Sequence, residues 1–225
     1  MVPNAENLRS YSSASRSNPR KVTPFGIVLI DYGMGNLHSV GKALEKSGAK
    51  VKISSNPKDI LKADKLVLPG VGAFKEAMRE LKKRKLIKPI IQHIKKGKVF
   101  LGLCLGLQLL FEESEEGGRV KGLNILKGCV KKFSAKLKIP HMGWNQIKIK
   151  KNNCPLFKNI QDKSYLYFVH SYYAAPKDKA IIAAVTNYGI NFTSVVWKDN
   201  TYAFQGHPEK SQRLGLKILE NFVRL

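Results

Sequence analysis

The sequence predicts an α/β protein whose core is a mainly parallel β-sheet flanked by helices, and three observations support this class. In the first half of the chain, short apolar runs alternate with stretches of helical period, which is the pattern of βαβ units. In the second half, short strands separated by turns predict antiparallel ribbons added to the parallel core. The 225 residues contain neither an internal repeat nor a linker, so we expect one folded domain.

The individual elements follow from the apolar runs and from the glycines that end them. Helices commonly end before a glycine, so Gly48 and Gly97 mark the ends of two predicted helices. The predicted strand 99–103 leads directly into a predicted helix at 105–113. The other predicted strands of the first half are 27–30, 51–54 and 65–68, and its other helices are 39–47, 74–81 and 89–96. The second half has predicted strands at 130–133, 146–150, 165–169, 181–185, 194–197 and 203–205, and a last helix at 214–223.

The composition is that of a soluble globular protein, with 43% apolar and 25% charged residues. No apolar run approaches the roughly 20 residues that cross a bilayer, so we expect no membrane partner. The three cysteines, Cys104, Cys129 and Cys154, have spacings that fit neither a disulfide framework nor a metal site. Their odd number favours a reducing compartment, and we expect Cys129 and Cys154 to be small buried residues.

The net charge of +24 raises the question of nucleic-acid binding. The excess is mostly lysine scattered along the chain, and no aromatic residues interleave with a basic stripe, as single-strand binding requires. The densest basic run, residues 82–85, falls in a predicted helix and is explained by a solvated helix face. We therefore expect no specific nucleic-acid partner.

Residues 1–25 differ from the rest of the chain. They are rich in serine, asparagine and proline, are basic, and show no apolar period. A disordered leader, a transit-like segment and a start-site artefact all fit this composition. We therefore assign the folded domain to residues 26–225.

Cys104 lies at the centre of the sharpest motif, Gly-Leu-Cys-Leu-Gly, between a predicted strand and a predicted helix. Glycines two residues before and after it, Gly102 and Gly106, allow the tight turn that exposes a nucleophile above a sheet. A helix N-terminus next to the thiol favours the reactive thiolate. The alternative is a buried cysteine in an apolar strand with incidental glycines.

His207 and Glu209 follow a predicted strand in the segment Phe-Gln-Gly-His-Pro-Glu-Lys-Ser. A cysteine nucleophile needs a base, and the base needs an acceptor that orients it, so this pair supplies both roles. A lone His-x-Glu is more often a surface pair. A third segment, Pro-Gly-Val-Gly at 69–72, lets a backbone amide turn toward a developing oxyanion, although an ordinary strand-to-helix loop has the same composition.

These three segments, in this order, resemble those of the class I (triad) glutamine amidotransferases over about the last 200 residues. Within this class, five segments resemble the glutaminase subunits of imidazole glycerol phosphate synthase, which act in histidine biosynthesis. The segments are DYGMGN at 31–36, PGVGAF at 69–74, PHMGWN at 140–145, YFVHSYY at 167–173 and HPEKS at 207–211. One position departs from the family pattern. Gly206 stands where the family has a bulky apolar residue, and we expect less packing beside His207.

The resemblance implies a single-domain class I glutaminase fold and an enzyme that converts glutamine to glutamate and ammonia. By resemblance, Cys104 is the nucleophile, His207 the base and Glu209 the residue that orients it. The backbone amides of Val71 and Leu105 are implied to stabilise the oxyanion. The residues implied to hold glutamine are Gly70, Gln108, Ser171 and Tyr172, although Gln108 taken alone also fits an exposed helix face.

The resemblance also implies a partner. The family docks on a (β/α)8-barrel cyclase, forming a heterodimer with an ammonia channel, and the cyclase makes imidazole glycerol phosphate and aminoimidazole carboxamide ribotide. An exposed Trp144 on a polar loop would suit an interface anchor, whereas the alternative is a core tryptophan. No metal or organic cofactor is implied, and the expected location is the cytoplasm, or the plastid stroma in a photosynthetic eukaryote. The residues implied to face the partner are Asn36, Met142, Trp144, Asn145 and Lys210.

Two other functions stay open at this point. One is a triad glutaminase that serves a different synthase, such as those for anthranilate, guanylate or pyridoxal phosphate. The other is a non-catalytic basic binding module that keeps the fold, which salt-sensitive retention on DNA would reveal. The segments at 140–145 and 167–173 argue against the first, and the intact set of Cys104, His207 and Glu209 argues against the second.

Overall fold

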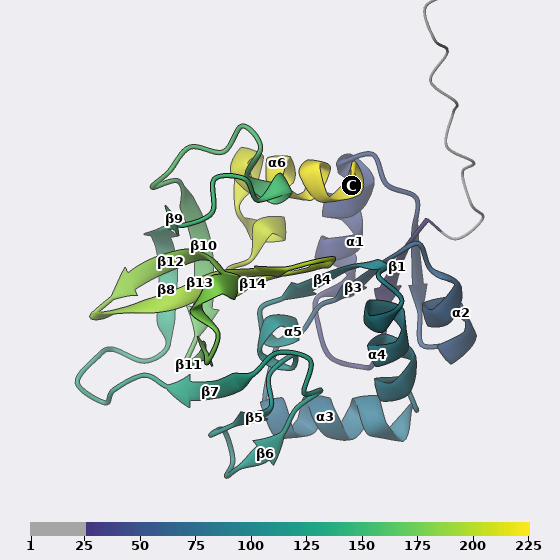
Figure 1. Cartoon of the computed structure of the whole chain (residues 1–225), viewed down its shortest axis with the longest axis horizontal. Helices are drawn as coiled ribbons and strands as arrows, with labels where there is room; N and C mark the ends of the chain where they lie inside the picture. The colour runs from purple at the N-terminus through teal and green to yellow at the C-terminus, as the bar shows by residue number, and fades with distance from the viewer. Residues whose placement is uncertain (1–25) are drawn as a thin grey trace, which may run out of the picture.

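The computed structural model describes residues 26–225, so the leader assigned to residues 1–25 lies outside the described residues. Twelve strands form one large sheet, and two more form a separate antiparallel ribbon (Figure 1). The expected α/β class is confirmed, with a parallel half that carries the helices and an antiparallel half added to it.

The parallel half has the strand order β2-β1-β3-β4-β14. β2 lies on one side of β1 and β3 on the other, and β14, the last strand in the sequence, lies next to β4. All four neighbouring pairs in this order are parallel. The strands are β1 (Ile27–Ile30), β2 (Val51–Ser54), β3 (Lys65–Leu68), β4 (Val99–Leu103) and β14 (Thr201–Phe204).

Helices cover both faces of this half because alternate strand residues point to opposite sides. Val28 and Ile30 of β1 pack into the core under α2, α3 and α4, whereas Ile27 and Leu29 pack into the core under α1 and α6 (Figure 1). β1 is buried on both faces and is apolar throughout, as expected for a strand of a covered parallel sheet. The helices are α1 (Leu37–Lys46), α2 (Pro57–Lys62), α3 (Phe74–Lys83), α4 (Ile87–Lys95) and α6 (Gln212–Val223).

The antiparallel half continues the sheet beyond β14 in the order β13-β11-β7-β5-β6, with β12 and β9 beside β13. A separate ribbon pairs β8 with β10 in antiparallel register. The strands of the sheet are β5 (Glu113–Ser114), β6 (Val120–Lys121), β7 (Gly128–Lys132), β9 (Lys148–Ile149), β11 (Tyr172–Pro176), β12 (Ile182–Tyr188) and β13 (Ile190–Lys198). The ribbon consists of β8 (His141–Gln146) and β10 (Tyr165–His170).

One predicted helix is wrong in length. The helix expected at 105–113 is only α5 (Leu105–Gln108), and the chain then turns into β5. Leu107, Leu109, Leu110 and Phe111 are all fully buried, so the segment has no solvent-facing side along which a helix would continue.

Sequence analysis also missed α2 and placed Trp144 on a loop, whereas Trp144 lies on β8. The signal for α2 was present, because Asn56 caps the helix and Pro57 occupies its first turn. Cys154 is buried as expected, but Cys129 is half-buried on β7. No helix among residues 26–225 has the length and apolar character that crossing a membrane requires.

Candidate active site

Cys104 occupies a strained turn between β4 and α5, with φ 52° and ψ −106°. A Cβ atom at Gly106 would lie 2.0 Å from the Leu68 carbonyl oxygen, and one at Gly102 would lie 2.7 Å from the Gly106 carbonyl oxygen. The turn therefore requires glycine on both sides of the cysteine. The Cys104 N–H donates a hydrogen bond of 2.7 Å to the Phe204 carbonyl, which fixes the turn against β14.

His207 and Glu209 come from the chain that leaves β14, the parallel neighbour of β4. The Nδ1 atom of His207 lies 2.7 Å from Oε1 of Glu209, and both side chains are 3% exposed. The loop is held by the His207 N–H, which donates to the Tyr167 carbonyl, and by the Ser211 hydroxyl, which donates to the His207 carbonyl. The buried Nε2 atom of His207 has no hydrogen-bond partner among residues 26–225, which leaves it free for the reacting groups.

The charge state of His207 is set by its two acidic neighbours. Burial disfavours the charged imidazolium, but interaction with Cys104 and Glu209 outweighs it and raises the pKa of His207 to about 10. At neutral pH the histidine is therefore protonated beside the thiol. A cation in this position favours a cysteine thiolate, the nucleophilic form.

A pocket of about 300 Å³ opens over Cys104. It brings together six residues that the sequence singled out, from both halves of the sheet. Gly70 is not among the lining residues, and none of the five residues expected at the partner surface borders this pocket. The lining residues are Val71, Gly72, Cys104, Leu105, Gln108, Glu116, Pro140, Val169, His170, Ser171 and Tyr172.

The two amides expected to hold the oxyanion are not both free in this conformation. The Leu105 N–H donates to the Gly70 carbonyl at 3.3 Å. The N–H of Val71 belongs to the same peptide as that carbonyl and points the opposite way, because a trans peptide is planar. A rotation of the Gly70–Val71 peptide would release the Leu105 amide and turn the Val71 amide inward.

Three polar residues of the site, Gln205, Glu116 and His170, lie outside the set expected from the sequence. Gln205 is fully buried directly after β14, and its Nε2 atom lies 3.8 Å from the Cys104 sulfur. Glu116 lines the pocket, and its Oε2 atom accepts a hydrogen bond from the Phe74 N–H at 2.8 Å. The place of Gln205 beside the His-Pro-Glu segment was a usable signal, whereas Glu116 reaches the pocket only because α5 is short.

The loss of packing expected at Gly206 does not occur. A Cβ atom there would lie 3.2 Å from the Phe168 ring and 3.2 Å from the Tyr167 carbonyl oxygen. The space that a larger residue would fill is already occupied by β10, so no void lies beside His207.

The residues expected at the partner surface gather mainly on the β8–β10 ribbon. Met142 and Trp144 of β8 are 63% and 46% exposed. The Trp144 ring packs edge-on against Tyr167, and the Lys210 ammonium lies 5.9 Å from the centre of the same tyrosine ring. Asn36 lies apart, at the start of α1, where its side chain accepts a hydrogen bond from a backbone N–H.

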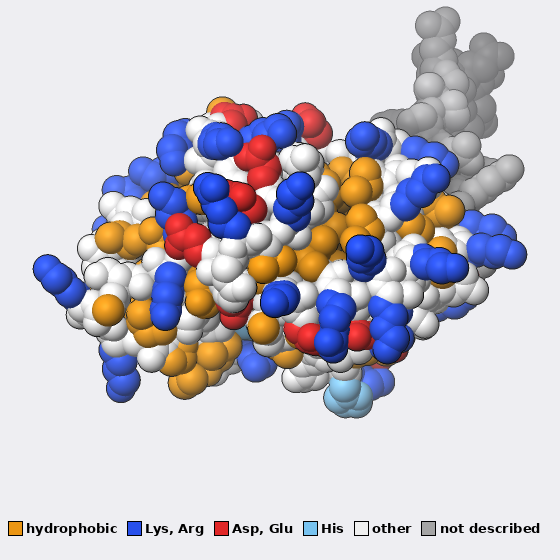
Figure 2. Space-filling view, turned by 90° about the horizontal axis from the view of Figure 1, so that it is seen from below, with side chains coloured by type: hydrophobic (Ala, Val, Ile, Leu, Met, Phe, Trp, Pro, Cys, Tyr) orange, Lys and Arg blue, Asp and Glu red, His pale blue; other side chains and the backbone are white. Residues whose placement is uncertain are grey.

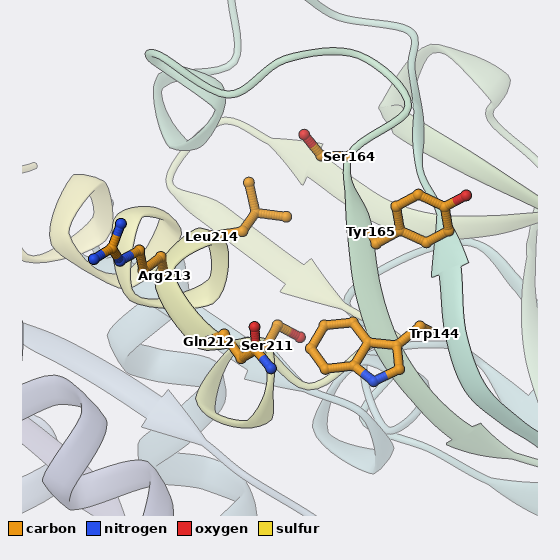
Figure 3. Close-up of a pocket in the computed structure, with 7 residues that line it drawn as sticks. All are labelled: Trp144, Ser164, Tyr165, Ser211, Gln212, Arg213 and Leu214. Carbon is orange, nitrogen blue, oxygen red and sulfur yellow. The ribbon is translucent and has the colours of Figure 1, made fainter.

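Beside this ribbon lies a second pocket of about 380 Å³. Figure 3 shows Trp144 and Tyr165 of the ribbon on one side and the residues at the start of α6, including Arg213 and Leu214, on the other. The lining is mixed, because Ser164, Ser211, Gln212 and Arg213 are polar and Trp144, Tyr165 and Leu214 are aromatic or aliphatic.

Basic side chains are spread singly over the face shown in Figure 2, between acidic and hydrophobic ones. Some lysines form ion pairs, and Glu112 pairs with both Lys127 and Lys177. Within residues 26–225, no group of three or more His, Cys, Asp or Glu residues has the arrangement of a metal site.

Residues 28–225 match the family described as glutamine amidotransferase class-I. The chain therefore belongs to the class I glutamine amidotransferases. It is 51% identical over 203 residues to the imidazole glycerol phosphate synthase subunit HisH of Syntrophotalea carbinolica, an alignment that covers 87% of this chain and 98% of the relative. The HisH subunit of Aquifex aeolicus is 52% identical over 198 residues, with 88% and 95% covered. Within its class, the chain belongs to the HisH family, and the resemblance seen in the sequence is confirmed.

Solved structures agree with the fold. A crystal structure of a glutamine amidotransferase has a TM-score of 0.69 at 14% identity and covers 88% of this chain and 99% of its own. PurLQS from Thermotoga maritima has a TM-score of 0.67 at 17% identity, with 89% and 98% covered. At such identities the likeness concerns the fold alone.

The turn at Cys104 gives a prediction about stability. Gly106→Ala places a methyl group against the Leu68 carbonyl and should lower the free energy of unfolding by more than about 2 kcal/mol. Gly41→Ala, in the middle of α1, meets only ordinary contacts of 3.8 Å or more and should raise it by up to about 1 kcal/mol. Urea denaturation of both variants checks this. If both variants changed the free energy of unfolding equally, the turn at Cys104 would tolerate a side chain at position 106.

A second prediction concerns pH. Burial lowers the pKa of three histidines: His93, His141 to about 4 and His170 to about 3. The unfolded chain, with histidine pKa about 6.5, then binds more protons, so stability should fall as pH drops from about 6.5 to about 4.5. His207, whose pKa is raised, binds more protons in the folded chain near pH 6.5 and above and opposes the trend there, but below about pH 5.5 it is protonated in both states and adds no slope.

Urea unfolding between about pH 5.5 and about pH 4.5, where His207 adds no slope, measures the effect of the other three histidines. His141→Asn removes one of the three groups and should make the slope shallower. An unfolding free energy that is constant over the window would contradict the assignment of buried, neutral imidazoles.

Proposed function

We propose that this chain is the glutaminase subunit of imidazole glycerol phosphate synthase, with its amidotransferase domain at residues 26–225. It hydrolyses glutamine to glutamate and ammonia and supplies the ammonia to a cyclase subunit. One arrangement supports the proposal most strongly: Cys104 lies on a strained turn at the edge of a pocket, next to the buried His207–Glu209 pair. The chain that carries it belongs to the HisH family.

The reaction follows from the geometry of these groups. The Cys104 thiolate attacks the carboxamide carbon of glutamine, and the negative charge that develops on oxygen is stabilised by the amides of Val71 and Leu105. His207 gives its proton to the departing nitrogen, so ammonia leaves and a thioester remains. His207 then takes a proton from water, which attacks the thioester and releases glutamate and the thiolate. Glu209 orients the imidazole through Nδ1 in both steps.

The pocket offers ligands for the other end of glutamine. Glu116 supplies a carboxylate and Gln108 an amide oxygen that can accept from the α-ammonium group, and the Ser171–Tyr172 segment supplies polar contacts for the α-carboxylate. We assign Gly70 to the backbone that positions Val71. A volume of about 300 Å³ suits one amino acid.

We assign the partner to the surface formed by Met142, Trp144, Asn145 and Lys210, extended by Asn36. An exposed tryptophan supported by a tyrosine is the kind of residue that anchors protein interfaces. The partner would be a (β/α)8-barrel cyclase, and a closed channel between the subunits would deliver ammonia before water protonates it.

Cys104→Ala should lower kcat for glutamine hydrolysis by at least about 10³, because no other group at the site can form the thioester. The assay is glutamate release by the complex of the variant with the cyclase. Cys129→Ala is the matched control, since Cys129 lies half-buried on β7 away from the pocket, and it should keep full activity. Turnover by Cys104→Ala above an enzyme-free blank would refute the role of the nucleophile.

The orientation of the Gly70–Val71 peptide predicts dependence on the partner. The free chain should hydrolyse glutamine slowly, and the cyclase with its nucleotide ligand should raise the rate by about 10²–10³, the value of one oxyanion donor. Val71→Pro lacks the amide hydrogen and should be activated much less than the wild type in the complex, whereas Val71→Ala should be activated like the wild type.

Steady-state glutaminase kinetics of the chain alone, with the cyclase, and with cyclase plus ligand test this. Full activity of the free chain, unchanged by either addition, would contradict the proposed switch.

A further inference from the structure

A line of hydrogen bonds runs from the ribbon to the wall of the pocket through two buried histidines that the mechanism does not use. Nδ2 of Asn145 lies 3.2 Å from Nε2 of His141. Nδ1 of His141 lies 3.0 Å from Nε2 of His170, and Nδ1 of His170 lies 2.8 Å from the Tyr172 carbonyl oxygen. His170 and Tyr172 line the pocket over Cys104.

The groups at the two ends of this line determine which atom donates and which accepts in each hydrogen bond. A carbonyl oxygen only accepts, so His170 carries its proton on Nδ1. Burial lowers the pKa of both histidines far enough to keep them neutral at pH 7, so Nε2 of His170 must accept from Nδ1–H of His141. Nε2 of His141 then accepts from Asn145, whose Nδ2 also donates to the Asn187 carbonyl at 2.9 Å.

The line continues beyond Tyr172 to the nucleophile. The Tyr172 carbonyl also accepts from Nε2 of Gln108 at 3.0 Å, and the same Nε2 donates to Oε1 of Gln205 at 3.2 Å. Nε2 of Gln205 in turn lies 3.8 Å from the Cys104 sulfur. The carbonyl held by His170 therefore also holds the glutamine-binding side chain of Gln108.

Among residues 26–225, the two histidines are enclosed by aromatic rings and have no further hydrogen-bond partner. The His141 ring is stacked between Phe168 and Tyr188, at centroid distances of 5.1 and 4.1 Å. The His170 ring packs against Phe133 and Phe192 at 5.3 and 5.0 Å. In such an apolar cage each hydrogen bond is strong, and losing one leaves a buried polar atom unpaired.

We propose that His141 and His170 are positioning residues for glutamine hydrolysis, which hold the Tyr172 carbonyl and through it the Gln108 amide at the substrate pocket. The proposal rests on the proposed function. Because Asn145 is the donor at the far end and lies next to the exposed Trp144, the same line connects the partner surface with the glutamine site.

The first test is kinetic and uses two substitutions of His141 in the complex with the cyclase and its ligand. His141→Phe keeps an aromatic ring between Phe168 and Tyr188 but has no donor or acceptor, and should raise KM for glutamine by about three- to tenfold with a smaller change in kcat. His141→Asn places an amide nitrogen near the position of Nδ1, where it can donate to His170, but it loses the acceptor of the Asn145 bond, so its KM should lie between those of the wild type and His141→Phe.

The second test acts at the surface end of the line, where folding is not at risk. Asn145→Ala removes the donor and should raise KM in the same direction as His141→Phe. Asn187→Ala is the matched control, because it keeps the backbone carbonyl that Asn145 contacts, and it should leave KM unchanged.

A spectroscopic readout is independent of activity. Long-range ¹H–¹⁵N spectra of the histidine rings in the free chain should show both His141 and His170 as Nδ1–H tautomers, and Asn145→Ala should disturb the His141 signal. An Nε2–H tautomer at either ring would overturn the proposal. So would a wild-type KM in both His141→Phe and Asn145→Ala, or equal KM values for His141→Phe and His141→Asn. A wild-type complex that releases no glutamate would instead refute the proposed function itself.

Discussion

The contact between Gly106 and the Leu68 carbonyl is the constraint on which the site depends. It brings the start of α5 against the end of β3, so the chain leaving β4 must turn sharply at Cys104. Because β3, β4 and β14 are adjacent parallel strands, the same edge of the sheet also carries the Gly70 loop and the His207 loop. Three segments far apart in sequence thus meet over one sulfur atom, and each is anchored by backbone hydrogen bonds.

The site contains histidines in opposite charge states, and their surroundings explain the difference. His207 is buried, but it faces a thiol and a carboxylate, and these raise its pKa. His141 and His170 are buried among aromatic rings with neutral partners, so desolvation lowers their pKa values. A protonated His207 beside Cys104 and the neutral His141 and His170 at the pocket wall can therefore coexist within one site.

The resting geometry also explains why partner binding and catalysis would be linked. The Gly70 carbonyl accepts the hydrogen bond of the Leu105 amide, and the turn at Cys104 packs so closely on Gly70 that a Cβ atom there would lie 2.8 Å from the Leu105 Cβ. The crowding selects glycine at position 70, and glycine tolerates more than one peptide orientation. The exposed ribbon that carries Trp144 lies at the other end of the hydrogen-bonded line to the pocket.

The sequence by itself determined the fold class, the strands of the parallel half and the proposal of Cys104, His207 and Glu209 as reacting groups. Apolar runs and local motifs carry that information over a few neighbouring residues. Only the tertiary structure decided that α5 stops at Gln108, that Phe168 fills the space beside Gly206, and that Glu116 and Gln205 reach the site. The line of hydrogen bonds from Asn145 to Tyr172 could not be predicted from the sequence either. Hydrogen bonds between separate strands depend on the register of the strands, and no local pattern encodes which buried polar atoms will meet.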